Sequence, residues 1–259
     1  MTTGMGASLR AICSDFYINH KVGVKLDLPR GRETVLELFE RVRRSHPDLG
    51  QFRRYKDELA LETAPGVERS QWVAVRSSNI RSGVVNPDDL GEAYALHRDV
   101  LETAPYFMSI SPLDIDFVEL LFGFDLEARG NHDAIVHRTL FGGSAMGDVL
   151  DMPGALPIAC QPMLGVALDT AAGGTIEAHL EIKTRGGGSS PMAGDLRERE
   201  SAEPISVYLT VRRYNPASDL KDLPGVLDAR AARGEELLAE RIVPGIIVPL
   251  REALLSGNG

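Results

Sequence analysis

The sequence predicts an α+β protein with a mostly antiparallel sheet of about seven strands and helices packed on one face. The first observation is a strand from Phe16 to Leu28, in which apolar residues alternate with polar ones such as Asn19 and Lys21. The second is the return of this alternation between Val118 and Leu126. We therefore expect a single α+β domain, 1–259, built from two pseudo-equivalent β-α-β-β-α halves at about 12–105 and 113–255.

Composition supports a globular protein and excludes some partners. The chain has 259 residues, of which 43% are hydrophobic and 25% are charged, and its formal net charge is −9. An acidic protein repels phosphate backbones and anionic lipid, so neither nucleic acid nor a membrane is expected as a partner. The longest apolar stretch, 242–250, contains two prolines and is shorter than the ~20 residues that a membrane helix needs.

The N-terminus and the cysteines indicate a cytoplasmic location. Residues 1–8 lack the basic segment and apolar core of a signal peptide. Cys13 and Cys160 lie far apart, with neither the spacing of a disulfide framework nor that of a zinc site. We expect both thiols to be reduced.

The first half is expected to read β-α-β-β-α. Pro29 and Gly31 interrupt the opening alternation, and apolar residues then recur at helical spacing. Asp88 and Asp89 suit the start of a second helix, and Pro105 is expected just past its end. The expected elements are a strand at 16–28, a helix with its apolar face at 35–42 that stops before His46-Pro47, strands at about 51–62 and 71–85, and a helix with its apolar face at 90–101 that ends before Pro105.

The second half is expected to read β-α-β-β-β-α. Asn131 is well placed as a helix N-cap, and Gly173-Gly174 is typical of a tight hairpin. Strict alternation places Phe122 and Leu180 on the buried face. The expected elements are a strand at 115–128, a helix at 131–141, strands at 163–169, 175–185 and 205–211 with a surface loop at 186–204, and a partly helical tail from 220 onward.

In the succession of its elements, the chain resembles the duplicated, saddle-like folds of the TATA-binding-protein type. This resemblance implies two structural repeats that share one antiparallel sheet. It does not extend to the signature residues of that family, and the acidic charge contradicts its DNA-binding role.

Two short strings match boxes of the calcineurin-like metallophosphoesterases. Residues 130–133 read GNHD, and residues 147–151 read GDVLD, which fits GDxxD. In that family the order is reversed, and two further boxes absent here supply the other ligands of a two-metal site. An Asn131 N-cap followed by the acidic Asp133 explains the first string, and Asp133 with His137 is interpreted as an ordinary helical pair. No metal is therefore expected.

Two polar groups are candidates for ligand binding. Residues 76–83 are polar on both faces, so they form either an edge strand, which we favour, or the wall of a polar groove. In a groove, Arg76, Asn79 and Arg81 would bind an anion or a carboxylate. The second group is Glu177, His179 and Glu181, on the outward face of their strand. A solvated sheet face is the simpler interpretation of this second group.

Two histidines fall on apolar faces of predicted elements. His20 lies on the inward side of the first strand, and His97 lies on the apolar stripe of its helix. We expect both to be core histidines hydrogen-bonded to backbone rather than catalytic bases or pH switches.

The sequence contains no nucleophile elbow, phosphate loop or dinucleotide-binding motif, so no cofactor is expected. We predict a non-enzymatic, cytoplasmic partner-binding protein of adaptor, immunity or assembly type. Its acidic surface and open sheet face would contact a basic protein or a second copy of the chain. The alternative is a small-molecule-binding protein or an enzyme with a site at the junction of the two halves, built from the two polar groups above. Apolar residues between 242 and 254 are expected to pack on the sheet or on a second subunit.

Overall fold

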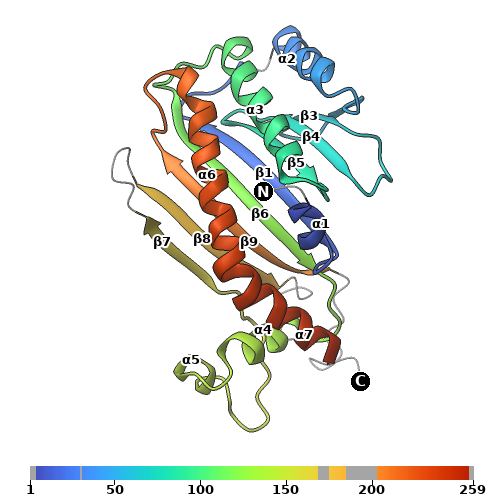
Figure 1. Cartoon of the computed structure of the whole chain (residues 1–259), viewed down its shortest axis with the longest axis vertical. Helices are drawn as coiled ribbons and strands as arrows, with labels where there is room; N and C mark the ends of the chain where they lie inside the picture. The colour runs from blue at the N-terminus through green and yellow to red at the C-terminus, as the bar shows by residue number, and fades with distance from the viewer. Residues whose placement is uncertain (1–3, 30, 169–174, 185–202, 257–259) are drawn as a thin grey trace.

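A nine-stranded, open antiparallel sheet organises the chain, in the order β2-β3-β4-β5-β1-β6-β9-β8-β7 (Figure 1). The computed structural model describes residues 4–29, 31–168, 175–184 and 203–256. The α+β class is confirmed, with more strands than the sequence predicts. The strands are β1 (Asp15–Val24), β2 (Gln51–Arg54), β3 (Leu59–Glu62), β4 (Ser70–Val75), β5 (Asn79–Val85), β6 (Ile115–Leu126), β7 (Met163–Leu168), β8 (Ile176–Thr184) and β9 (Ile205–Tyr214).

The two longest connecting helices, α3 and α6, lie across the same face of the sheet and contact each other (Figure 1). Helix α6 continues through a π-helical segment, η2, into α7. In the part of the chain that the structure describes, no helix combines the length and apolar character of a membrane span. The helices are α1 (Met5–Arg10), α2 (Arg32–Ser45), α3 (Leu90–Phe107), α4 (His132–Phe141), α5 (Ala145–Asp148), η1 (Leu220–Asp222), α6 (Leu223–Leu237), η2 (Leu238–Ile247) and α7 (Val248–Ser256).

Two strands predicted as single elements are hairpins, which accounts for the extra strands. The expected strand at 51–62 turns back where the Tyr55 N–H donates to the Glu58 carbonyl at 2.8 Å. The expected strand at 71–85 turns where the Arg76 N–H donates to the Asn79 carbonyl at 2.9 Å. The prediction of an edge strand at 76–83 is therefore wrong. Residues 76–78 are polar because they form a turn, and β5 lies between β4 and β1.

The predicted start of α4 is confirmed, whereas the predicted end of α3 is wrong. Asn131 caps α4 as expected, because its Oδ1 accepts from the Ala134 N–H at 3.0 Å. Helix α3 instead passes through Pro105, which was expected to lie just past its end, and continues two residues further to Phe107. The hairpin turn at Gly173-Gly174 and most of the loop at 186–204 lie outside the described residues.

The core lies between the central strands and the helices. Phe16 of β1 pairs with Phe124 of β6, and their fully buried rings are 5.0 Å apart. Phe122 is also fully buried, as predicted. Leu180 points to the same face but is only half-buried, because it lies one strand from the edge of the sheet.

The C-terminal segment is buried against its own chain. Ile242, Ile247 and Leu250 are inaccessible or nearly so, and α7 packs on α4 while η2 contacts β9. Pro244 lies inside the π-helical segment. Proline has no N–H to donate, and the segment has the wider turn of a π-helix at the same place. The expected apolar contact is thus supplied within one chain.

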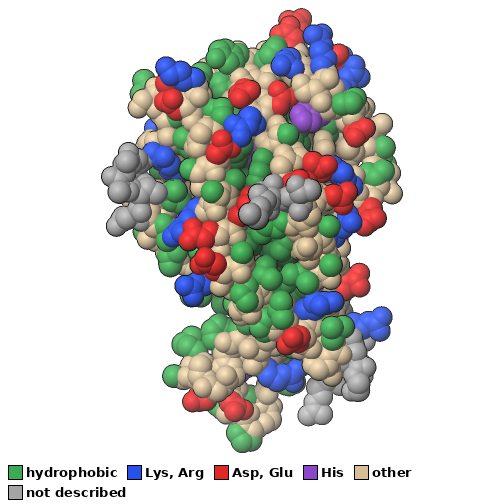
Figure 2. All heavy atoms as spheres, viewed as in Figure 1, with side chains coloured by type: hydrophobic (Ala, Val, Ile, Leu, Met, Phe, Trp, Pro, Cys, Tyr) green, Lys and Arg blue, Asp and Glu red, His purple; other side chains and the backbone are tan. Residues whose placement is uncertain are grey.

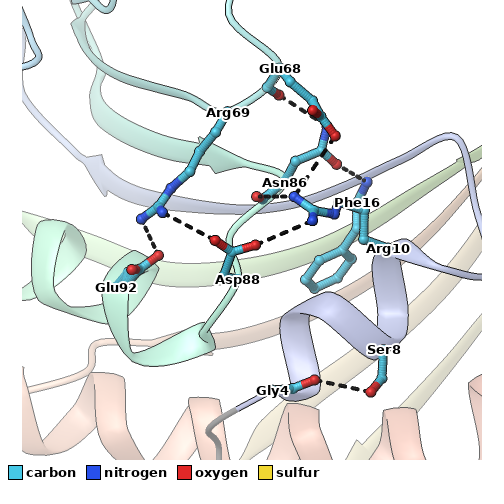
Figure 3. A network of polar contacts seen from close by, with 9 residues as sticks. All are labelled: Gly4, Ser8, Arg10, Phe16, Glu68, Arg69, Asn86, Asp88 and Glu92. Carbon is cyan, nitrogen blue, oxygen red and sulfur yellow. Dashed lines mark hydrogen bonds and ion pairs between the residues drawn. The ribbon is translucent and has the colours of Figure 1, made fainter.

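A polar network fixes α1 and the start of β1 (Figure 3). Asn86 adopts the left-handed conformation with φ 53°, which asparagine tolerates better than most residues. Its Oδ1 accepts from the Phe16 N–H at 3.0 Å, and its Nδ2 donates to the Glu68 carbonyl at 3.1 Å. Arg10 of α1 pairs with Asp88 at 3.3 Å, so the N-terminal helix is held against the loop that leads to α3.

Candidate functional site

The outward face of the sheet carries a row of charged side chains of both signs. The strand register aligns them across five strands, from β5 to β8. In this row Glu119 accepts from Arg212 Nε at 2.8 Å, and the Arg212 guanidinium also lies over the Phe117 ring. The opposite charges of this pair compensate each other. The members of the row are Arg81, Lys21, Glu119, Arg212 and Glu177.

Arg76, Asn79 and Arg81 lie at the β4–β5 turn and on β5, and their carboxylate partner is internal. Glu58 accepts from Arg76 Nε at 2.7 Å and is also paired with Arg81. Asn79 is buried and donates to Ser78 Oγ at 3.3 Å. Arg76 and Arg81 therefore bind a carboxylate of the same chain, and Asn79 contacts no carboxylate in the described structure.

Glu177, His179 and Glu181 lie along β8 on the same outward face. His179 Nε2 is 3.2 Å from Glu177 Oε2, and Lys183 Nζ is 3.2 Å from Glu181 Oε1. Three strands separate this group from Arg81, a distance of about 19 Å along the sheet at ~4.8 Å per strand. The structure does not bring the two predicted groups together.

Rings cover glycines at four direct cross-strand pairs of the same face. A methyl group added at Gly83 or Gly23 would overlap the facing ring, and one added at Gly165 would come within 2.9 Å of the His179 ring. Aromatic cover of strand glycines shields the backbone without a second layer. The pairs are Gly83 with Trp72, Gly23 with Phe117, Gly123 with Tyr17, and Gly165 with His179.

The residues of the GNHD string make local contacts. Asp133 Oδ1 accepts from the Cys160 N–H at 2.8 Å and from the Thr184 hydroxyl, which ties the segment before β7 to β8. His132 Nε2 contacts the Ala128 carbonyl at 3.2 Å, and His137 Nε2 contacts the Gly147 carbonyl at 3.1 Å. Within the described residues no three His, Cys, Asp or Glu side chains form a group that fits a metal ion.

The edge strand β7 exposes apolar side chains. Its sequence is MLGVAL, and Met163, Leu164 and Val166 are 69%, 63% and 55% exposed. Such edges usually carry charges or prolines that prevent pairing with other chains. Among the described residues β7 has a strand neighbour on one side only, which is β8.

A polar cluster is enclosed between the sheet and the two long helices. Ser82 of β5 and His20 of β1 are cross-strand neighbours, and His97 of α3 lies above them. Ser82 Oγ is 2.8 Å from His97 Nδ1, and the two imidazole rings stack at 5.5 Å. Arg230 of α6 is fully buried, and after burial and His97 its charge is the third cause that lowers the pKa of His20. We refer to Ser82, His20, His97 and Arg230 as the buried cluster.

Burial determines the charge of the cluster. Burial lowers the pKa of His97 to about 3, against a smaller opposing effect of the Ile18 backbone, and it lowers the pKa of His20 well below its usual value. It also lowers the pKa of Arg230 to about 9, with the charge of Arg213 adding to the shift. At neutral pH both imidazoles are neutral and the guanidinium is charged.

The sequence reasoning found part of this cluster. It placed both histidines in the interior but expected them to bond to backbone. Instead, His97 Nδ1 contacts the Ser82 hydroxyl, and neither ring nitrogen of His20 has a hydrogen bond. It missed Ser82 and Arg230. A signal for Arg230 was present, because this arginine occupies the apolar stripe of its helix with Leu223, Leu227 and Gly234.

Comparison of the sequence with known protein families and with curated proteins finds no match. A functional interpretation therefore depends on the geometry of the site itself.

Proposed function

We propose that this chain is a non-enzymatic, cytoplasmic partner-binding protein, and that its partner adds an extended segment to the free edge of β7. The observation that carries the proposal is an edge strand of six apolar residues, most of them solvent-exposed. Unpaired backbone groups along such an edge recruit another strand, and exposed apolar side chains add burial energy.

The alternation of hydrogen bonds between β7 and β8 identifies the backbone groups that a partner would use. The Ile182 N–H donates to the Pro162 carbonyl at 3.0 Å, and the register of β7 with β8 continues without a shift. Residues 162, 164, 166 and 168 therefore direct their backbone groups toward β8. Met163, Gly165 and Ala167 direct theirs to the open edge, since antiparallel strands alternate in this way.

Charge favours a basic partner. The chain carries a formal net charge of −9, and a second copy would bring the same charge to the interface. On β8, Glu177 and Glu181 lie opposite Ala167 and Met163. We therefore expect a segment that alternates apolar and basic residues, lying on β7 as a continuation of the open sheet face.

Fluorescence anisotropy with a labelled eight-residue peptide of alternating Val and Lys tests the proposal. We expect this peptide to bind more tightly than its Val and Glu counterpart. Ala167→Pro removes one outward N–H and should weaken binding at least about tenfold, the loss expected from a hydrogen bond and altered strand geometry. Ala167→Val keeps that N–H and serves as the matched control.

Three results would count against the proposal. The first is equal affinity for the two peptides, and the second is unchanged binding by Ala167→Pro. The third is a stable dimer in analytical ultracentrifugation that Ala167→Pro dissociates. That dimer would make a second copy of the chain the occupant of the edge.

We also propose that the two halves are structural repeats. The sheet order supports this, because β1 and β6 lie side by side at the centre while β5 and β9 flank them in equivalent places. Superposing residues 14–104 on 114–255 should align β1 with β6 and α3 with α6. A superposition in which the opening strands have unrelated neighbours would contradict duplication.

A second candidate function is small-ligand binding at the junction of the halves. The observation that favours it is the buried cluster, to which α3 of the first half and α6 of the second both contribute. The sequence-predicted residues Arg76 and Glu177 are not part of this cluster.

A further inference from the structure

Arg230 is a buried cation without a partner. The residue is 0% exposed, and its Nε, Nη1 and Nη2 atoms form no hydrogen bond within the described structure. No carboxylate of the described residues forms an ion pair with it. An uncompensated buried charge is strongly destabilising, so such groups are normally paired or bound to a ligand.

The position of Arg230 follows from the packing of its helix. Four residues further along α6, a methyl group at Gly234 would lie 2.8 Å from Cζ of Phe122, so this face of the helix lies directly on β6. Arg230 precedes Gly234 by one turn, about 6 Å along the helix axis. Two strand residues span about 6.8 Å, and α6 runs in the same direction as β6 (Figure 1). Arg230 therefore lies near Leu120 of β6, which is the cross-strand neighbour of His20.

The groups around the guanidinium are donors or neutral. Both ring nitrogens of His20 and Nε2 of His97 have no hydrogen bond, although every member of the buried cluster is at most 1% exposed. Arg213 of β9 brings a second positive charge close to Arg230. Two acids on the surrounding elements are engaged elsewhere, because Glu235 accepts from Tyr94 at 2.9 Å and Glu119 is paired with Arg212 on the opposite face.

We propose that Arg230, His20 and His97 enclose a binding site for one small monovalent inorganic anion, of the size of chloride or bromide. A single negative charge neutralises the guanidinium, and a spherical ion accepts hydrogen bonds from the guanidinium and imidazole N–H groups in any direction. Every member of the cluster is at most 1% exposed, so the protein would enclose the ion rather than hold it at its surface. A water molecule would bring no charge, so it would leave the guanidinium uncompensated.

The site lies where the two long helices meet the sheet, so the anion would join the two parts of the chain. A ligand that binds only the folded state stabilises it in proportion to ln(1 + [L]/Kd). The inferred ion is thus a structural ligand of the α3–α6 junction. This inference does not depend on strand addition at β7, about which neither experiment below gives information.

Thermal unfolding at constant ionic strength gives the first test. Replacing sodium gluconate with sodium chloride should raise the Tm of the full chain by at least about 2 °C, because gluconate is too large to be enclosed. Arg230→Met should abolish this chloride dependence. Arg233→Met is the matched control and should retain it, because Arg233 lies on the same helix, is partly exposed and is paired with Glu236.

Crystals of the unaltered chain grown in sodium bromide give a second test, which does not require a variant to fold. We expect an anomalous peak within hydrogen-bond distance of Arg230 and His20. Water density or no density at that place would overturn the proposal. A peak that persists in Arg230→Met would show an adventitious ion only, and equal chloride dependence of Tm in the unaltered chain and Arg230→Met would also overturn it.

Discussion

Burial of a single side chain depends on which strand carries it as much as on the residue type. Phe122 and Leu180 both lie on the helix-covered face of strictly alternating strands. Phe122 is on the central strand β6 and is fully buried, whereas Leu180 on β8 is half-buried. Lys183, also on β8, points to the opposite face and pairs with Glu181.

These positions predict a graded response to truncation. Phe122→Ala should destabilise the protein by about 3–5 kcal/mol, the typical loss for a buried phenylalanine. Leu180→Ala should lose less than the 2–5 kcal/mol of a fully buried leucine, and Lys183→Ala should stay within ~0.5 kcal/mol. Urea unfolding measures all three. Equal shifts for the three variants would mean that the faces are wrongly assigned.

The glycines of α6 allow a matched pair of substitutions. Gly234 lies against the Phe122 ring, so the methyl group of alanine has no room, and overpacking typically costs about 1–3 kcal/mol. Nothing lies within 4 Å of a methyl group at Gly225. Gly225→Ala should therefore gain up to ~1 kcal/mol from helix propensity, while Gly234→Ala should lower stability in the same denaturation assay. A gain in both variants would contradict the close packing of α6 on β6.

At the scale of elements, the helices are held to the sheet by polar as well as apolar contacts. His97 of α3 reaches Ser82 of β5, and the neutral imidazoles of His97 and His20 stack between helix and strand. Neutral buried histidines make the junction sensitive to acid, because the unfolded chain can take up protons that the folded chain excludes.

Acid should lower the stability of the folded protein through His97. The pKa of His97 is about 3 in the folded protein and near 6.5 when it is unfolded, so stability is full above pH 6.5 and falls as the pH decreases toward 3. Between pH 7 and pH 5, protonation linked to His97 alone should lower the free energy of unfolding by about 2 kcal/mol. His97→Gln should show a correspondingly smaller acid loss in urea unfolding, whereas His179→Gln, on the outward sheet face, should match the unaltered chain. The same acid loss in His97→Gln and the unaltered chain would exclude this histidine as a source.

Edge strand β7 differs from its neighbouring strands because most of its side chains and its outer backbone groups lack cover among the described residues. The outward charges of β8 pair along their own strand, Arg212 of β9 pairs with Glu119 of β6, and glycines on this face are covered by rings. The apolar side chains of β7 remain exposed, and its outer backbone groups have no strand neighbour among the described residues. The edge of the sheet is therefore a stronger candidate for docking than its open face.

At the scale of the whole molecule, charge is distributed rather than concentrated. Figure 2 shows acidic and basic side chains interspersed over much of the helix-covered face, with hydrophobic side chains gathered between α6 and α1. A net charge of −9 thus arises from many separated groups. It favours basic partners by long-range attraction, which salt screens beyond about 8 Å at 0.15 M.

The C-terminal segment connects distant parts of the molecule. Ile247 and Leu250 are fully buried, η2 contacts β9, and α7 packs on α4. Deleting residues 240–259 removes at least three buried aliphatic side chains, each typically worth about 2–5 kcal/mol, so the truncated chain should aggregate or unfold. Size-exclusion chromatography and circular dichroism measure this. A truncated chain that stays monodisperse with unchanged unfolding would show that the segment is dispensable.

Local patterns were sufficient for much of the fold. The alternation from Phe16 to Leu28 predicted a half-buried strand, and the placement of Asn131 predicted a helix cap that the structure confirms. Each feature depends on neighbours a few residues away, whose geometry is set by strand or helix periodicity. Turns were less visible, because the polar residues 76–78 have no glycine or proline to mark them within a predicted strand.

By itself, the sequence determined the α+β class, the buried faces of the central strands and the inward position of His20 and His97. Only the tertiary structure decided that β5 is internal, that β7 is an edge, and that Arg230 lies beside His20. These facts depend on which faces of α3, α6 and the sheet meet, and such contacts join residues about two hundred positions apart. Periodicity identifies a buried face. Which element covers that face is decided by the packing of the whole chain, and no local sequence pattern encodes it.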